Sequence, residues 1–200
     1  MRYGLKQVSF SYRGTSVLRD VSWTLPRRGV VCLWGPSGGG KTTLLRLLAG
    51  LEHPKAGAVT LPDDGRVAMV FQEDRLLPWM TALENVMLPG AERQLAEDML
   101  RSLGLGEELH RLPGELSGGQ QRRVAIARAL AAPGDLLLLD EPFNGLDEVS
   151  WRMAVPLILQ RAEEVPVVLV THVEQHAQAL NAEVLHLEET LLQGVLNQIG

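Results

Sequence analysis

The strongest constraint on this fold is a glycine-rich loop between a predicted strand and a predicted helix. The loop begins at Gly35, ends at Thr42 and fits the pattern G-x-x-x-x-G-K-[ST]. An apolar run at residues 30–34 predicts a buried strand before it, and residues 43–49 predict a helix that Gly50 ends. This order predicts an α/β fold with an anion site at the helix start.

The predicted anion site has backbone and side-chain parts. Glycines let backbone N–H groups turn onto phosphate oxygens, and the helix N-terminus adds partial positive charge. Lys41 is predicted to reach the β- and γ-phosphates of a nucleotide, and the Thr42 hydroxyl is predicted to reach Mg²⁺. The residues expected to contact phosphate are Gly35, Pro36, Ser37, Gly38, Gly39, Gly40, Lys41, Thr42 and Thr43.

Two further motifs lie later in the chain. Leucines 136–139 predict a strand buried on both faces of a parallel sheet, and Asp140 and Glu141 follow at its carboxyl end, where such sheets bind ligands. Asp140 suits Mg²⁺, directly or through water, and Glu141 suits a general base for an attacking water. The run Leu-Ser-Gly-Gly-Gln at residues 116–120 precedes a helical pattern, which predicts a second helix N-terminus suited to an anion.

These motifs, in this order, resemble those of the nucleotide-binding subunits of ABC transporters, and the resemblance covers nearly the whole chain. The glycine-rich loop resembles Walker A, residues 136–141 resemble Walker B, and residues 116–120 resemble the ABC signature. The resemblance implies one ABC ATPase domain over residues 1–200, without a C-terminal regulatory domain. It implies a P-loop NTPase core with a mixed, mostly parallel sheet, an N-terminal antiparallel β subdomain, and a helical subdomain inserted at about residues 78–132.

The resemblance extends to isolated positions. Tyr12 matches the aromatic residue that stacks on adenine, and Gln72 matches the Q-loop glutamine that contacts Mg²⁺ and the attacking water. Asp147 matches the D-loop, although the two residues before Leu146 differ from the common Ser-Ala. His172 matches the switch histidine that touches the γ-phosphate, although Val173 stands where the family often has Asp.

The resemblance implies an ATPase that uses ATP and Mg²⁺. The implied catalytic residues are Glu141, His172, Gln72 and Lys41, and the implied metal ligands are Thr42, Gln72 and Asp140. Two copies are implied to close head to tail on ATP, so that Ser117, Gly118 and Gly119 of one copy cap the γ-phosphate held by the other. Closing and reopening would then move a membrane permease.

The implied permease contact lies beside the Q-loop. Leu76, Leu77 and Trp79 are bulky apolar residues just after Gln72, so they are expected to meet a permease helix, although Trp79 could equally belong to the core. The run at residues 71–79 is similar to importers of nitrate, sulfonate, taurine and pyrimidine precursors, and residues 111–115 are similar to thiamine importers. Neither run would touch cargo, so the transported substrate stays open.

Composition agrees with this interpretation. With 200 residues, 46% hydrophobic and 22% charged, the chain can form a soluble domain with a core. The net charge of −5 disfavours broad nucleic-acid binding. Cys32, the only cysteine, lies in an apolar strand, where it is expected to be a buried hydrophobe. The start of the chain lacks a signal-peptide pattern and no apolar run approaches about 18 residues, so a cytoplasmic location, peripheral to the membrane through the permease, is expected.

Other interpretations remain open. ABC-type ATPases also serve DNA repair, ribosome-associated work and cluster assembly, usually with insertions or basic extensions that this chain does not show. A phosphate-loop kinase would need an acceptor-binding lid, and the signature run argues against it.

Minor features favour structural explanations. His172 and His176 have metal-pair spacing but no evident third ligand. Arg122 and Arg123 could touch phosphate or nucleic acid, but a solvated helix face is favoured. Pro156 predicts a kink or break in a helix at residues 148–163.

Overall fold

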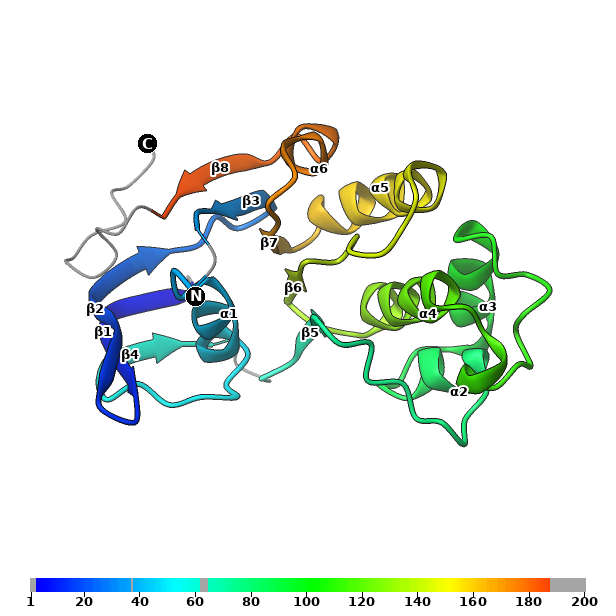
Figure 1. Cartoon of the computed structure of the whole chain (residues 1–200), viewed down its shortest axis with the longest axis horizontal. Helices are drawn as coiled ribbons and strands as arrows, with labels where there is room; N and C mark the ends of the chain where they lie inside the picture. The colour runs from blue at the N-terminus through cyan, green and yellow to red at the C-terminus, as the bar shows by residue number, and fades with distance from the viewer. Residues whose placement is uncertain (1–2, 37, 62–64, 188–200) are drawn as a thin grey trace.

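The computed structural model describes residues 3–36, 38–61 and 65–187. Within these ranges two sheets form (Figure 1). The antiparallel sheet has the order β2-β1-β4, and the parallel sheet has the order β5-β6-β7-β3-β8. The strands are β1 (Gly4–Tyr12), β2 (Thr15–Thr24), β3 (Gly29–Trp34), β4 (Ala56–Thr60), β5 (Val67–Val70), β6 (Leu136–Asp140), β7 (Pro166–Val170) and β8 (Glu183–His186).

The helices divide between the two sides of the molecule. In Figure 1, α1 lies beside the antiparallel sheet, whereas α2, α3 and α4 form a separate helical lobe, with β5 and β6 between the two. The helices are α1 (Lys41–Leu48), α2 (Ala82–Met87), α3 (Arg93–Ser102), α4 (Gly118–Ala131), α5 (Glu148–Ala162) and α6 (Glu174–Ala179), with a 3-10 turn at Pro113–Glu115. The predicted fold class, an α/β nucleotide-binding core with an antiparallel subdomain and inserted helices, is confirmed.

The parallel sheet separates two hydrophobic cores. Residues alternate across a strand, so Val30 and Cys32 of β3 face the core shared with the helical lobe and α5. Val31 and Leu33 face the core shared with α1 and the antiparallel sheet. The leucines of β6 divide in the same way, which explains why this strand is apolar at every position that precedes Asp140.

The strands β4 and β5 flank residues 62–64 in the sequence but belong to different sheets, β4 to the antiparallel one and β5 to the parallel one, and residues 62–64 lie outside the described ranges. One local expectation was wrong. The break expected at Pro156 is absent, because α5 runs as one helix from Glu148 to Ala162. Its buried face, which includes Trp151, Ala154 and Ile158, packs on the core and holds the helix together across the proline.

The strand order places the site. Parallel strands β5, β6, β7 and β3 are neighbours and point the same way, so the segments that follow them leave the same edge of the sheet. Those segments carry Gln72, Asp140 with Glu141, His172 and the glycine-rich loop. Groups from four distant parts of the sequence therefore meet at one edge.

Candidate active site

A cavity of about 380 Å³ lies at this edge, between the parallel sheet, α1 and the start of the antiparallel sheet. Most of its lining had been predicted from sequence, whereas Val17 and Val170 had not. The lining residues are Tyr12, Val17, Gly38, Gly40, Lys41, Thr42, Thr43, Gln72, Asp140, Glu141 and Val170. The structure thus brings together the residues predicted for adenine, phosphate, Mg²⁺ and water.

The glycine-rich loop is held open by backbone geometry. Gly38 and Gly40 have φ of 82° and 81°, in the left-handed region that glycine occupies without steric cost. A Cβ on Gly40 would also stand 3.2 Å from the side chains of Val17 and Leu18. Gly40 is the residue immediately before α1, so N–H groups at the start of that helix face the cavity region. Ser37, which was predicted to contact phosphate, lies outside the described residues.

Lys41 is folded into the loop. Its Nζ donates to the carbonyl oxygens of Gly35 and Pro36, each at 2.7 Å, and the side chain is buried. These neutral oxygens keep the ammonium at the cavity wall without cancelling its charge. The cation is therefore available to an anion that enters the cavity.

Thr42 and Asp140 bring two oxygen donors together from α1 and β6. The Thr42 hydroxyl donates to Asp140 Oδ1 at 3.3 Å. Burial raises the pKa of Asp140 above its ordinary range, and the Thr42 hydrogen bond opposes that rise. Hard oxygen donors such as these, with the Gln72 amide on the same cavity, are the type that Mg²⁺ prefers, so the residues present fit this ion.

Glu141 and His172 form the second polar pair. His172 Nδ1 lies 3.0 Å from Glu141 Oε1, and the histidine side chain is 70% exposed and is not part of the cavity lining. Glu141 has φ of 49°, an uncommon conformation for a residue with a side chain. Such a conformation costs about 1–3 kcal/mol and persists only where surrounding contacts enforce it.

Tyr12 forms an aromatic wall of the cavity. It is 39% exposed, its ring packs edge-to-face on Phe10 with centroids 4.8 Å apart, and its hydroxyl donates to Glu52 Oε1 at 3.1 Å. The last contact orients the ring, and the sequence had given no sign of it. A fixed, half-exposed aromatic ring is suited to stacking on a base.

We predict that Tyr12→Ala weakens ATP binding moderately. Loss of a stacking pair costs about 0.5–1.5 kcal/mol, so the Kd for ATP should rise by no more than roughly tenfold. Discrimination between ATP and GTP should also weaken. Titration of both nucleotides against wild type and Tyr12→Phe, which keeps the ring, measures this. A loss as large as that caused by removing Lys41 would contradict the prediction.

The signature and D-loop residues do not line this cavity. Ser117 immediately precedes α4 and accepts from the Gln120 N–H, while the Gln120 side chain accepts from the Ser117 N–H, which forms a capping box. Ser117 and Gly118 are exposed and Gly119 is partly exposed. Asp147 precedes α5, and its carboxylate accepts from the Ser150 N–H at 2.7 Å, which lowers the pKa of Asp147. None of these residues belongs to the lining of the chain's own cavity.

Arg122 was misjudged from the sequence. Its side chain is only 3% exposed and donates to backbone carbonyls of the segments that follow β5 and β6, so it does not lie on a solvated face. Helical spacing contained the signal, because Arg122 lies four residues before buried Ile126 and therefore on the same face of α4. Arg123 is half-buried and donates to the Leu103 carbonyl at 2.8 Å.

His176 and Cys32 have structural surroundings. His176 packs edge-to-face against Phe143 and Trp151, and burial lowers its pKa. The Thr171 hydroxyl lies 3.1 Å from its Nδ1, and among the described residues no group of three metal-ligating side chains forms around it. Cys32 is buried in β3, and that burial raises its pKa to about 11.

Together, the fold and the cavity define a P-loop ATPase. A glycine-rich loop with a buried lysine connects β3 to the start of α1, and two acidic residues lie at the end of β6, two strands away in the same sheet. A family model described as "ABC transporter" matches residues 18–144. The chain belongs to the ABC transporter family, as an ATP-binding subunit with ATPase activity.

Relatives of known class agree. An aliphatic sulfonates import ATP-binding protein of Rhodococcus jostii is 45% identical, over 91% of this chain and 77% of that protein. An Fe(3+) ions import ATP-binding protein of Brucella abortus is 43% identical, over 92% of this chain and 58% of that protein. A solved ATP-binding cassette, a dimer in a post-hydrolysis state with ADP and Pi, is 31% identical with a TM-score of 0.83 and covers 98% of this chain and 97% of that one.

Proposed function

We propose that this chain hydrolyses ATP to power a permease that imports a small molecule. One observation carries the proposal: a single cavity is lined by Tyr12, Lys41, Gln72, Asp140 and Glu141, which come from four separate parts of the sequence. Each has the chemistry that one part of ATP hydrolysis requires. The names of the relatives, import subunits for sulfonates and for Fe(3+), support the direction of transport.

In the proposed mechanism, positioning and electrostatics do most of the work. Adenine stacks on Tyr12, and the phosphates lie on the backbone N–H groups of residues 38–43, with Lys41 on the β- and γ-phosphates. Glu141 accepts a proton from the attacking water, and Gln72 orients that water. His172, beside Glu141, donates a hydrogen bond to the γ-phosphate as negative charge develops on it.

We further propose that Thr42, Gln72 and Asp140 hold Mg²⁺. When bound, the ion neutralises charge on the β- and γ-phosphates. The proximity of the Thr42 hydroxyl and the Asp140 carboxylate supports this assignment.

We propose that two copies form a head-to-tail dimer, and the position of the signature supports this. Ser117, Gly118 and Gly119 occupy the exposed start of α4 and do not line the chain's own cavity, so they are free to cap the γ-phosphate in a second copy. Asp147, which precedes α5, lies at a similar helix start. Related cassettes have been solved as dimers, which supports this arrangement.

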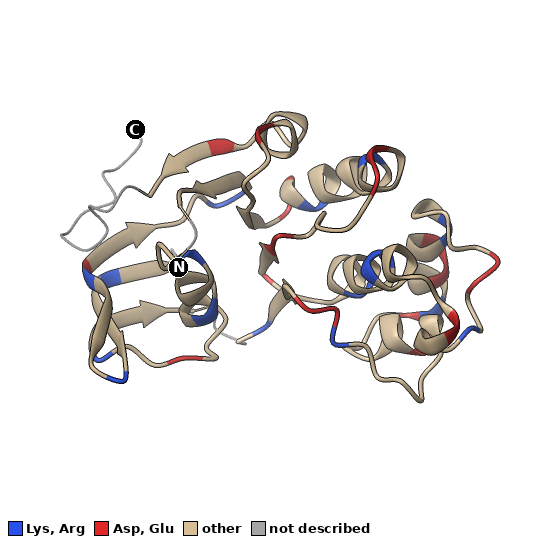
Figure 2. Ribbon diagram, in the orientation of Figure 1, with Lys and Arg blue, Asp and Glu red and all other residues tan. Residues whose placement is uncertain are grey.

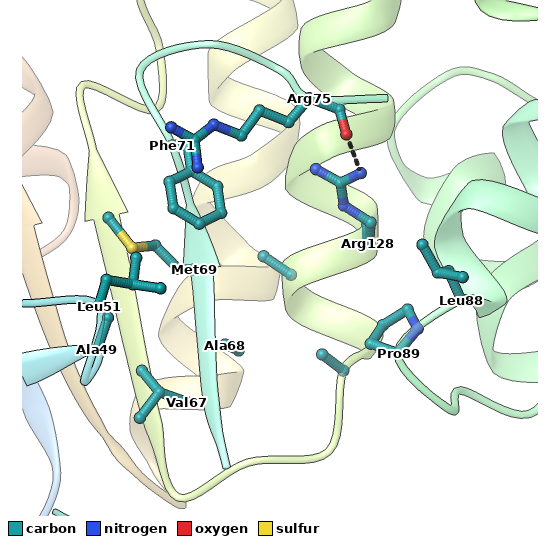
Figure 3. Close-up of a pocket in the computed structure, with 12 residues that line it drawn as sticks. Ala49, Leu51, Val67, Ala68, Met69, Phe71, Arg75, Leu88, Pro89 and Arg128 are labelled. Carbon is teal, nitrogen blue, oxygen red and sulfur yellow. Dashed lines mark hydrogen bonds between the residues drawn. The ribbon is translucent and has the colours of Figure 1, made fainter. Parts of the chain in front are cut away.

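A second cavity, a groove of about 420 Å³, is the place where we propose that a permease helix binds (Figure 3). Ala49 and Leu51 line it from the end of α1, Phe71 and Arg75 from the segment after β5, and Leu88 from the helical lobe. The groove is mainly apolar and touches the Q-loop segment directly. A permease helix seated there would contact the residues next to Gln72, which would couple transport to the ATP site.

The residues first expected at this contact occupy different places. Leu76 packs on the core, and Leu76, Leu77 and Trp79 are not part of the groove lining. Trp79 is 71% exposed on a turn that the buried Asn85 side chain fixes through the Leu77 N–H and the carbonyls of Leu77, Met80 and Thr81. A large aromatic residue displayed on a rigid turn favours a partner contact over a core role, so we propose that Trp79 lies at the edge of the permease interface.

We predict that Leu88→Asp weakens assembly with the permease while ATP affinity stays within about twofold, because Leu88 is exposed in the groove and does not line the ATP cavity. Trp79→Ala should weaken assembly too, since truncating an interface anchor costs about 2 kcal/mol or more. Co-purification with the permease measures both, and Val184→Asp, on exposed β8, is the matched control. Wild-type assembly of both variants would exclude this face as the interface.

The substrate and the location are tested together. The chain would be reconstituted with a candidate permease and binding protein, and ATP-dependent uptake of sulfonates and of Fe(3+) would be measured in vesicles. In this proposal the chain works at the cytoplasmic face of the membrane through the permease; none of the helices described is long and apolar enough to cross a bilayer. ATP hydrolysis without any uptake, in a chain that co-purifies with DNA or ribosomes, would favour a non-transport ATPase.

The charge distribution gives no support to that alternative. Lysine and arginine positions are interspersed with acidic ones along the chain in both halves of the view (Figure 2). The net charge is −5, and nucleic-acid binding proteins generally carry a basic footprint.

A further inference from the structure

Arg122 of α4 is the most highly connected buried side chain near the active site. Every nitrogen of its guanidinium donates a hydrogen bond to the segments that carry the catalytic groups. A buried charge needs this degree of hydrogen bonding, and the planar fork of arginine can supply it to several acceptors at once. The acceptors are therefore informative about what the residue does.

One set of acceptors belongs to the segment that ends β6. Arg122 Nε donates to the Pro142 carbonyl at 2.8 Å, and Nη2 donates to the carbonyls of Asp140 at 3.1 Å and Glu141 at 2.6 Å. The Glu141 N–H donates in turn to the Val170 carbonyl at 2.9 Å. Both backbone polar groups of Glu141 are thus held, the carbonyl also by the Asn144 N–H at 3.2 Å, and these contacts together favour its left-handed φ of 49°.

The other set belongs to the Q-loop segment. Arg122 Nη1 donates to the Phe71 carbonyl at 2.6 Å, to the Gln72 carbonyl at 3.4 Å and to the Asp74 carboxylate at 3.0 Å. Arg128, further along α4, donates to the carbonyls of Asp74 and Arg75, which both lie on the Q-loop side. Among the residues that the structure describes, Arg122 joins the Q-loop backbone to the backbone of Glu141.

We propose that Arg122 is a positioning residue for ATP hydrolysis: its fork holds Glu141 and Gln72 in a fixed mutual arrangement around the attacking water. This inference rests on the proposed role of Glu141 as general base. It adds that the signature helix α4, which begins at Ser117, sets the geometry of that base directly through one side chain. Arg122 hydrogen-bonds only the backbone of Gln72, Asp140 and Glu141, and none of its hydrogen bonds reaches Lys41, Thr42 or Tyr12, so it should act on rate more than on ATP affinity.

The test compares Arg122→Met, which removes the donors, with Arg122→Lys, which keeps the charge next to Asp74 but not the fork. A misplacement of about 1 Å can cost roughly 100-fold in rate, so kcat should fall by about 10–100-fold in both variants. The KM and the Kd for ATP should stay within about threefold of wild type. Arg161→Met is the matched control, because Arg161 also donates to a backbone carbonyl, that of Gly134, but away from the cavity.

A double mutant separates positioning from general stability. If Arg122 acts through Glu141, Arg122→Met should cause little further loss of turnover in the Glu141→Gln background. Additive losses, or a kcat unchanged in a folded Arg122→Lys, would overturn the proposal. If Arg122→Met does not fold, Arg122→Lys alone decides the question, through its kcat and its Kd for ATP, each measured with and without Glu141→Gln. If Glu141→Gln by itself kept wild-type turnover, the proposed role of Glu141 as general base would be wrong. That result is distinguishable from failure of the Arg122 proposal alone, in which Glu141→Gln loses turnover but Arg122→Lys does not.

Discussion

Glu141→Gln should nearly abolish ATP hydrolysis while ATP binding is retained. An amide cannot accept the proton of the attacking water, and removal of a general base typically costs about 10²–10⁴-fold in rate. Binding should persist because the phosphates contact the glycine-rich loop and Lys41, which the substitution leaves in place. Phosphate release measured with excess ATP, together with nucleotide titration of the isolated chain, gives the two quantities.

The variant should also accumulate as an ATP-bound dimer, since closure would no longer be followed by hydrolysis. Gel filtration with and without ATP detects this species. Glu183→Gln, an exposed carboxylate on β8, is the control and should hydrolyse ATP like wild type. Turnover at the wild-type rate in Glu141→Gln, with the permease present, would remove Glu141 from the mechanism.

Lys41→Ala should remove most of the stabilisation that ATP gives to the fold. A ligand present at 100 times its Kd stabilises the native state by about 2.7 kcal/mol, and each kcal/mol shifts the Tm of a domain of this size by about 2–4 °C. Wild type should therefore show a clear ATP-dependent rise in Tm, and Lys41→Ala should show little. Thermal unfolding with and without ATP measures the difference.

The substitution also removes the hydrogen bonds from Lys41 to the carbonyls of Gly35 and Pro36, so the Tm without ATP serves as the baseline for each variant. Lys55→Ala, at an exposed lysine outside the cavity, should keep the full ATP-dependent rise. A wild-type rise in Lys41→Ala would show that the loop backbone binds the phosphates without help from the lysine.

Much of the site was predictable because local motifs encode it. The glycine pattern before Lys41 requires the left-handed conformations that the structure has at Gly38 and Gly40. The leucine run of β6 predicted a strand buried on both faces, with Asp140 and Glu141 at its carboxyl end, and the structure has this arrangement. The placement of Ser117 at a helix start was likewise visible in the spacing of the residues after it.

Tertiary structure decided what the sequence left open, because those features depend on contacts between distant segments. The hydrogen bond from Tyr12 to Glu52, the exposure of Trp79 and the continuity of α5 through Pro156 all follow from packing that no local pattern records. Arg122 is the clearest case. Helical spacing places it on the buried face of α4, but the carbonyls that surround it come from the ends of β5 and β6, which only the assembled sheet brings to α4. The sequence by itself determined which groups carry the chemistry, and the folded chain determined which backbone and side chains hold them in place.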